Sequence, residues 1–351
     1  MALSSAKRAL IAVFVLVLLV CGAAAVYWVR LHRPFPAFSE GKPPDIMNLL
    51  PGDAPVVIYI DAQTLRELQG SPLAAVLGLT NPNPQQDRDY ADFVRETGFN
   101  YESDLDRAAV AIWPAGMATL ENPLGDDHVF AVAEGRFDQN KIAAYALRTG
   151  HIETRGSRTI YEVPGEPPIA FQFLSADRIV IASGKAGDAL LGDAVPQARD
   201  AAMQARIDRV AGAPFFGVAR LDHLSESFYE NFRNFSEADK VVRSIRALSL
   251  SGKPQGNDIL LALDAECDSI KNALEISTLL DIARMYGSVA LSDPHTRSRM
   301  TKQQVAFAKA FLRSVDVSHQ DRLVRITLNT TPDMLQAASA ASASHGGALN
   351  R

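Results

Sequence analysis

Two stretches of the chain share one pattern of apolar and polar positions. Residues 54–68, "APVVIYIDAQTLREL", read as a buried strand that runs into a helix, and residues 213–227, "APFFGVARLDHLSES", repeat that order. A short, continuous apolar run that leads into a helical pattern indicates a strand inside a packed body. The repetition predicts that the chain consists of two related halves, each of which begins with this strand–helix motif.

Further elements can be matched between the halves. In each, a strand-like run precedes an aspartate that can cap a helix, an apolar helical stripe and a glycine that can end it. The runs are residues 128–137 and 258–267, the caps are Asp138 and Asp268, and the final glycines are Gly150 and Gly287. Alternating hairpin patterns follow at residues 170–183 and 314–328. The agreement of order, caps and stops favours an internal duplication.

The pattern predicts an α+β fold. We expect two related halves, each with a mostly antiparallel or mixed sheet and helices on one face, preceded by a single transmembrane helix. The second half carries an extra helix at residues 301–314, where Thr301 and Gln304 can form a capping box.

The first thirty residues predict the location. Residues 9–29 form an uncharged apolar run that is long enough to cross a hydrocarbon core of ~30 Å as a helix. Lys7 and Arg8 precede the run, which favours a cytoplasmic N-terminus. We therefore expect a single-pass protein of the bacterial inner membrane with its C-terminal body in the periplasm.

Two alternatives concern this segment. Ala23-Ala24-Ala25 resembles the cleavage site of a signal peptide, but the apolar run continues as far as Val29. Cys21 could carry a lipid, yet it lacks the small residue that usually precedes a lipidated cysteine. The uncleaved anchor is the favoured interpretation. The expected order is a cytoplasmic N-terminus (1–8), a membrane helix (9–29), a proline-rich stalk (30–48), the halves (49–196 and 197–336) and a flexible Ala/Ser-rich tail (337–351).

Charge and cysteine content exclude several classes of protein. The chain of 351 residues has a formal charge of −5, and residues 1–33 hold four basic residues and no acid. The rest of the chain therefore carries −9, which repels phosphate backbones, so no nucleic-acid partner is expected. The two cysteines, Cys21 and Cys267, are too few for a thiolate metal cluster, and we expect no disulfide between them.

A family resemblance supports the envelope location. The stretches "LLPGDAPVVIYID", "DYADFVRETGFNYESDLDRAAVAI" and "EGRFDQNKIAAYALRTG" resemble an uncharacterised family of bacterial, membrane-anchored envelope proteins found among acidobacteria. The resemblance covers residues 49–183. It implies a bacterial protein that faces the envelope, and it implies no activity or site residue.

Motifs for chemistry are weak. The acidic group Glu102, Asp104 and Asp106 could act as paired carboxylates, but a solvated loop is the favoured interpretation. Residues 126–128, Asp-Asp-His, could bind a metal only with partners from elsewhere in the chain. Residues 183–185, Ser-Gly-Lys, lack the rest of a phosphate loop. We expect no cofactor and no metal, and we identify no catalytic residue.

The best candidate for a binding surface is an aromatic stripe on a predicted helix. Phe228, Phe232 and Phe235 recur at helical spacing, with Tyr229 beside them. Most such stripes face the core of their own domain, and the alternative is a groove that meets a partner protein or an apolar ligand.

The leading hypothesis for function is a membrane-anchored, extracytoplasmic binding or scaffold protein of the cell envelope, without an enzymatic activity. The expected partners are the lipid bilayer, through the N-terminal segment, and an envelope protein or apolar ligand. The alternative is a membrane-tethered hydrolase whose site is assembled from residues distant in sequence.

Overall fold

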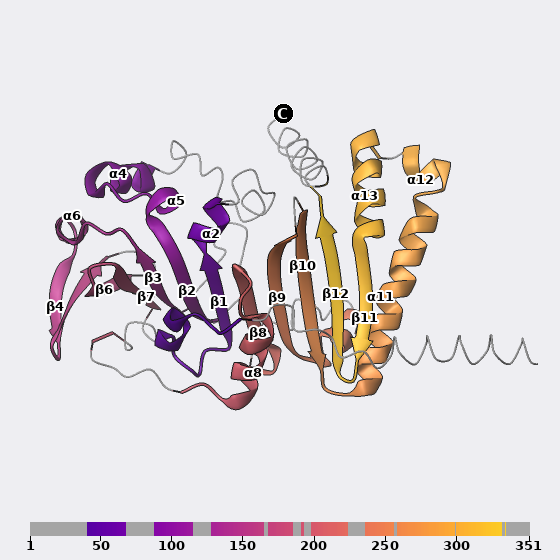
Figure 1. The fold of residues 1–351 in the computed structure, drawn as a ribbon, viewed down its shortest axis with the longest axis horizontal. Coiled ribbons are helices and arrows are strands. Elements are labelled where there is room, and N and C mark those ends of the chain that lie inside the picture. The colour runs from indigo at the N-terminus through magenta and orange to yellow at the C-terminus, as the bar shows by residue number, and fades with distance from the viewer. Residues whose placement is uncertain are drawn as a thin grey trace, which may run out of the picture.

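The computed structural model describes residues 41–67, 88–114, 128–164, 168–184, 191–192, 198–223, 236–255, 258–298, 300–331 and 334. These residues form one antiparallel sheet with helices on both of its faces (Figure 1). The strands are β1 Val56–Asp61, β2 Leu105–Trp113, β3 His128–Gly135, β4 His151–Arg155, β5 Arg158–Val163, β6 Ile169–Ser175, β7 Arg178–Ser183, β8 Phe215–Arg220, β9 Ile245–Gln255, β10 Asp258–Cys267, β11 Val315–Gln320 and β12 Leu323–Thr330. The helices are η1 Asp45–Leu49, α2 Ala62–Glu67, α4 Arg88–Thr97, α5 Tyr101–Asp104, α6 Gln139–Ala146, α8 Ala201–Val210, η2 Leu221–His223, α10 Ser236–Arg243, α11 Ile270–Ala290, α12 Pro294–Ser298 and α13 Lys302–Ser314.

The order of strands in the sheet is β11-β12-β10-β9-β8-β1-β2-β3-β7-β6-β5-β4. Read outward from the centre, the first half has the order β1, β2, β3, β7, β6, and the second half has the order β8, β9, β10, β12, β11. In each half three strands follow in chain order, and then come the two strands of a hairpin with the later strand placed first. The first half extends this order with β5 and β4. The two halves therefore share one topology on either side of the central pair.

The central pair is formed by the two stretches that open each half. Reciprocal hydrogen bonds continue the pairing beyond the strand ends: the Asp61 N–H donates to the Pro214 carbonyl at 2.7 Å, and the Arg220 N–H donates to the Pro55 carbonyl at 2.8 Å. Pro55 and Pro214 occupy the same place in the two repeated motifs. The repeated pattern in the sequence thus marks two strands that pair with each other.

The predicted fold class needs correction. We expected a sheet in each half with helices on one face, and the sequence left open whether the two halves share one sheet. The structure has helices on both faces, and β1 and β8 pair along their length to make one twelve-stranded sheet. The physical reason is that both strands carry apolar side chains on both faces, as strands inside a sheet do, so neither can serve as a solvated edge. Pairing the two strands removes both edges at once.

The membrane helix was also part of the predicted fold class. In the described part of the chain, no helix combines the length and the apolar character needed to cross a bilayer. The expected N-terminus, spanning segment and tail, residues 1–8, 9–29 and 337–351, lie outside the described residues. The last residues of the expected stalk form η1, and its Ile46 and Met47 are fully buried in the body.

One face of the sheet, called the first face here, carries a row of apolar residues that crosses every strand. Each residue lies directly opposite the next one in the register of the sheet. The row consists of Ile152, Tyr161, Phe171, Ile181, Ala131, Val110, Ile58, Gly217, Leu250, Leu263, Ile326 and Val317. Helices α6 and α11 pack on this face near its two ends, and Leu65 of α2 packs on it between them.

The opposite, second face holds the largest core. Met47 of η1 and Met203 and Ile207 of α8 pack there against Val57, Tyr59, Val132, Phe216 and Val218 of the central strands. Both faces of the central strands are therefore covered by apolar contacts, which fits their uninterrupted apolar sequences.

Some helix ends differ from the prediction. Asp138 caps α6 as expected, by accepting from the Lys141 N–H at 3.1 Å, and the Thr301–Gln304 capping box is confirmed. In the second half Ser269, not Asp268, caps α11. Gly287 does not end α11, because it lies within the helix where Leu312 of α13 approaches, 3.2 Å from an ideal Cβ. Gly287 allows close packing of two helices there.

A buried ion pair links two strands on the second face. The Arg325 guanidinium of β12 donates to both carboxylate oxygens of Asp264 in β10, at 2.6 and 2.7 Å, and both residues are buried. Two parallel charge-assisted bonds fix the register of this strand pair.

This geometry predicts a large penalty when only one partner is removed. Arg325→Met should lower the free energy of unfolding by about 3–5 kcal/mol, because it leaves the Asp264 charge buried without its guanidinium. The double variant Asp264→Leu with Arg325→Met should recover most of that loss. Urea denaturation of both variants checks this, and equal losses in the two would contradict it.

Candidate functional site

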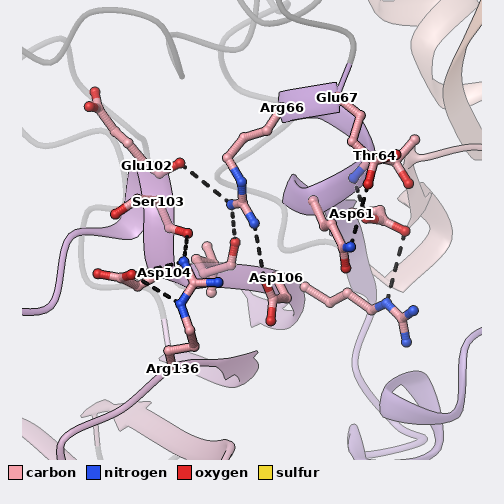
Figure 2. Close-up of polar contacts among 12 residues, drawn as sticks. Asp61, Thr64, Arg66, Glu67, Glu102, Ser103, Asp104, Asp106 and Arg136 are labelled. Atoms are coloured by element: carbon pink, nitrogen blue, oxygen red, sulfur yellow. Dashed lines mark hydrogen bonds and ion pairs between the residues drawn. The ribbon is translucent and has the colours of Figure 1, made fainter.

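Two acidic residues near the start of β2, Asp104 and Asp106, are ion-paired with arginines. Figure 2 shows Arg136 reaching Asp104, at 3.0 Å, and the Ser103 carbonyl. Asp104 also accepts from the Asn100 N–H at 2.9 Å. Partial burial opposes ionisation, but the Asn100 N–H and the Arg136 guanidinium together lower the pKa of the Asp104 carboxyl.

Asp106 is also ion-paired, and Glu102 is held through its main chain. Arg66 of α2 pairs with Asp106 at 2.9 Å and donates to the carbonyls of Glu102 and Leu105 (Figure 2). The predicted cluster of Glu102, Asp104 and Asp106 is thus brought together, as a set of contacts that fasten α2 and α5 to β2. A general acid at neutral pH needs a raised pKa, and the lowered pKa of Asp104 is the opposite.

A row of alternating charges continues from this cluster across neighbouring strands. Asp61, Arg107, Glu134 and Arg178 lie directly opposite one another in the register of β1, β2, β3 and β7. Arg107 lies 3.9 Å from Asp61 and 3.7 Å from Glu134, and Arg178 pairs with Glu134. Each carboxylate faces a guanidinium, so the row stabilises strand pairing and leaves no acid placed for proton transfer.

A serine and a histidine meet between α11 and the edge strand β11. The Ser277 Oγ lies 3.1 Å from the His319 Nδ1. The same hydroxyl lies 3.0 Å from the Leu274 carbonyl, one turn earlier in the helix, and Ser277 is buried. A nucleophile must reach its substrate, so this contact joins a helix to a strand rather than forming a catalytic pair.

The weaker motifs fall mostly outside the described residues. This is true of Asp126, Asp127 and Lys185, whereas His128 and Gly184 lie side by side at one end of β3 and β7. An ideal Cβ on Gly184 would lie 2.2 Å from the His128 Nδ1, so the imidazole occupies the space that glycine leaves open. Among the described residues, no group of three or more His, Cys, Asp or Glu side chains could hold a metal ion.

The aromatic stripe singled out in the sequence cannot be placed, because Phe228, Tyr229, Phe232 and Phe235 lie outside the described residues. A different apolar surface is present on α11. Its inner side packs on the sheet through Ala273 and Ile276.

The outer side of α11 exposes large apolar side chains. Leu279, Ile282, Tyr286 and Val289 are 54%, 40%, 66% and 63% exposed, and we call these four residues the α11 seam. Their spacing of three, four and three residues places them along one side of the helix. Figure 1 shows α11 at the outer end of the sheet, beyond β11 and β12. Apolar side chains gathered in this way typically mark a binding surface.

The sequence analysis predicted one apolar stripe on this helix and did not predict an exposed apolar side. Its apolar residues lie on all sides, and a helix with that pattern is normally buried on all sides. The signal that could have revealed the seam is the seven-residue repeat, since Leu279 and Tyr286, like Ile282 and Val289, are one heptad apart.

An ion-pair network holds α8 on the second face. Arg206 donates to both carboxylate oxygens of Glu266 at 3.0 Å, and Arg209 adds a contact at 3.2 Å. The hydrogen bonds from Arg206 are the main reason why the pKa of the Glu266 carboxyl is lowered. The neighbouring Cys267 is a free, buried thiol, and burial raises its pKa to about 11, so it stays protonated and unreactive.

Comparison with protein-family models gives no match, and comparison with curated proteins gives none either. Among solved structures, crystal form IV of TP0453 is similar at 12% identity, with 84% of this chain and 96% of that chain covered and a TM-score of 0.45. Crystal form III of TP0453 gives 11% identity, 85% and 98% coverage and a TM-score of 0.43. Likenesses of this size are too distant to support a statement about function.

The Glu266 network predicts a dependence of stability on pH. A lowered pKa in the folded state adds stability above the unfolded pKa of about 4.3, and that stability is lost as the pH falls through the folded pKa. Glu266→Gln should therefore cost about 1–3 kcal/mol at pH 7 and much less in acid. Urea denaturation at both pH values measures the difference.

The matched control is Glu275→Gln on the exposed side of α11, where Glu275 lies 3.7 Å from Lys271. An exposed pair of this kind contributes at most about 0.5 kcal/mol, so the control should unfold almost as the wild type does. A pH-independent loss in Glu266→Gln would rule out the assigned role of the carboxylate charge.

Proposed function

We propose that the protein is a non-catalytic binding or scaffold protein of the bacterial cell envelope and that it binds its partner through the α11 seam. The observation that carries the proposal is the exposure of four large apolar side chains on one side of a helix whose other side is anchored in the core. Leaving them in water is unfavourable, and a partner that covers them removes that cost.

The location belongs to the same proposal. Placement of the body in the periplasm, beside the inner membrane, is supported by the uncharged run at residues 9–29 and by the basic residues before it. The negative charge of the body also favours a protein or apolar partner over a nucleic acid. The ion-paired acids described above support binding over hydrolysis.

Magnitudes indicate a weak, reversible contact. Complete burial of a large apolar side chain gains roughly 1.5–3 kcal/mol, and the seam residues are already about half covered. Four of them would contribute on the order of 3–6 kcal/mol, against a cost of association of about 4–15 kcal/mol. The partner must therefore supply further contacts or be kept close by.

A site-specific photocrosslinker tests the proposal. Benzoylphenylalanine in place of Tyr286 should give a light-dependent protein adduct of one discrete mass in cells that produce the full chain. The matched control is the same group in place of Leu147, which is also exposed but lies at the other end of the sheet. Absence of a discrete adduct at Tyr286, or equal adducts at both positions, would refute binding through the seam.

A further inference from the structure

We propose that residues 30–40 of the predicted stalk dock, as extended chain, on the second face of the sheet across β9, β10, β12 and β11. The α11 seam plays no part in this proposal, because α11 packs on the first face. Four features support it: the burial of this part of the second face, a buried hydroxyl on it, the place where the described chain begins, and the length and charge of the stalk.

This part of the second face is buried although the core of that face does not extend over it. Ala262 of β10 is 1% exposed, and its neighbours Asp264 and Arg325 are 3% and 6% exposed. In the described part of the chain, the apolar core of the second face includes residues of β1, β2, β3 and β5 to β8, and none of β9 to β12. Ala262 belongs to no other apolar cluster of the described residues either. Such burial requires a covering segment, and the core of this face does not supply it.

A buried hydroxyl indicates that the cover is extended main chain. Ser251 of β9 lies directly opposite Ala262 and is 1% exposed. Its Oγ has no hydrogen-bond partner among the described residues. Buried polar groups normally have a partner. A helix bonds its own N–H and C=O groups internally, whereas extended chain presents them to its neighbours.

The described chain begins at the inner end of this surface. Gly41, the first described residue, lies against Gly212 at the end of α8, since an ideal Cβ on Gly41 would lie 2.6 Å from the Gly212 Cα. Gly212 lies shortly before β8 in the chain. From the start of β8, one row of opposed residues crosses the second face to the sheet edge: Phe216, Ser251, Ala262, Thr327 and Asp316. The residues before Gly41 therefore start beside this row.

The length of the stalk matches the row. From β8 to the edge strand β11 the row crosses four strand spacings, or about 19 Å at ~4.8 Å each. Pro34 and Pro36 favour extended chain, which advances about 3.1 Å per residue. About six residues cross the row at that advance, so residues 30–40 are long enough to reach beyond β11.

The charges of the stalk complement the outer end of the row. Asp316 of β11 is exposed, and it has no ion pair among the described residues. Arg33 precedes Gly41 by eight residues, which is about 25 Å of extended chain and brings it to the β11 edge. Opposite charges at this point would fix the register of the docked stalk. The predicted membrane segment would then leave the body at the end of the sheet that carries α11 (Figure 1).

Alkylation of single cysteines tests whether the face is covered. In a Cys21→Ser background of the full chain, purified in mild detergent, Ala262→Cys and Thr327→Cys should react with N-ethylmaleimide at least about tenfold more slowly than Thr278→Cys. Thr278 is the matched control, because it is exposed on α11 at the first face. Cys267 is fully buried and does not react.

Replacement of residues 30–40 by an equal length of Gly and Ser tests the identity of the cover. The change removes the prolines, the phenylalanines and the basic side chains of the stalk. It should speed alkylation of Ala262→Cys and Thr327→Cys by about tenfold or more. The rate of Thr278→Cys and the circular dichroism should stay unchanged, which shows that the body remains folded.

Disulfide formation tests the path of the stalk. Ala37 precedes Gly41 by four residues, about 12 Å of extended chain, and Thr327 lies three strand spacings from β8, about 14 Å. In the same Cys21→Ser background, Ala37→Cys with Thr327→Cys should therefore oxidise to an intramolecular disulfide, measured by mass and by loss of alkylation. Ala37→Cys with Thr278→Cys is the matched control, and it should stay reduced.

Three results would overturn the inference. Fast alkylation of Ala262→Cys and Thr327→Cys in the unaltered stalk would show that the face is open. Unchanged protection after the stalk is replaced would show that another segment covers it. Equal oxidation of the pair with Thr327→Cys and the pair with Thr278→Cys would show that the stalk does not follow this path. All three results leave the α11 seam and the proposed function intact.

Discussion

The pairing of β1 with β8 is the contact on which the rest of the structure depends. It joins two halves with the same strand order into one sheet, and it removes the two edges that would otherwise expose apolar strands to water. It also aligns the apolar row of the first face across all twelve strands. Because that row is continuous, helices at both ends of the sheet pack on one common surface.

The two faces of the sheet are used differently. The centre of the second face is closed by η1 and α8. The second face also holds the buried ion pair of Asp264 with Arg325 and the partly buried pair of Arg206 with Glu266. The first face carries separate helices, of which α11 is the longest in the described residues. Because α11 lies at the end of the sheet, its inner side packs on the body and the large apolar side chains of its outer side stay exposed.

The polar chemistry of the molecule serves stability. Arginines hold the acids near α5 and β2, and charges alternate across β1, β2, β3 and β7. The carboxylates of Asp61, Asp104, Asp106 and Glu134 each lie close to a guanidinium, and these ion pairs hold the side chains in place. The α11 seam differs from these ion pairs, because its apolar side chains are exposed to water and their burial by another molecule would be favourable.

Local signals in the sequence determined several elements: the central strands, the cap at Asp138 and the capping box at Thr301 follow from residue type and spacing. The tertiary structure decided which strands pair and which helix sides are buried. Whether two apolar strands lie in separate sheets or pair with each other depends on which edges meet, and no local pattern encodes that. In the sequence Gly287 resembles a helix stop, and only the fold shows that it makes room for Leu312. The sequence also does not show that the outer side of α11 is exposed, because that depends on where the sheet ends. Whether a side chain is buried depends on neighbours that lie far away in sequence, and so the exposed apolar side of α11 could be found only in the fold.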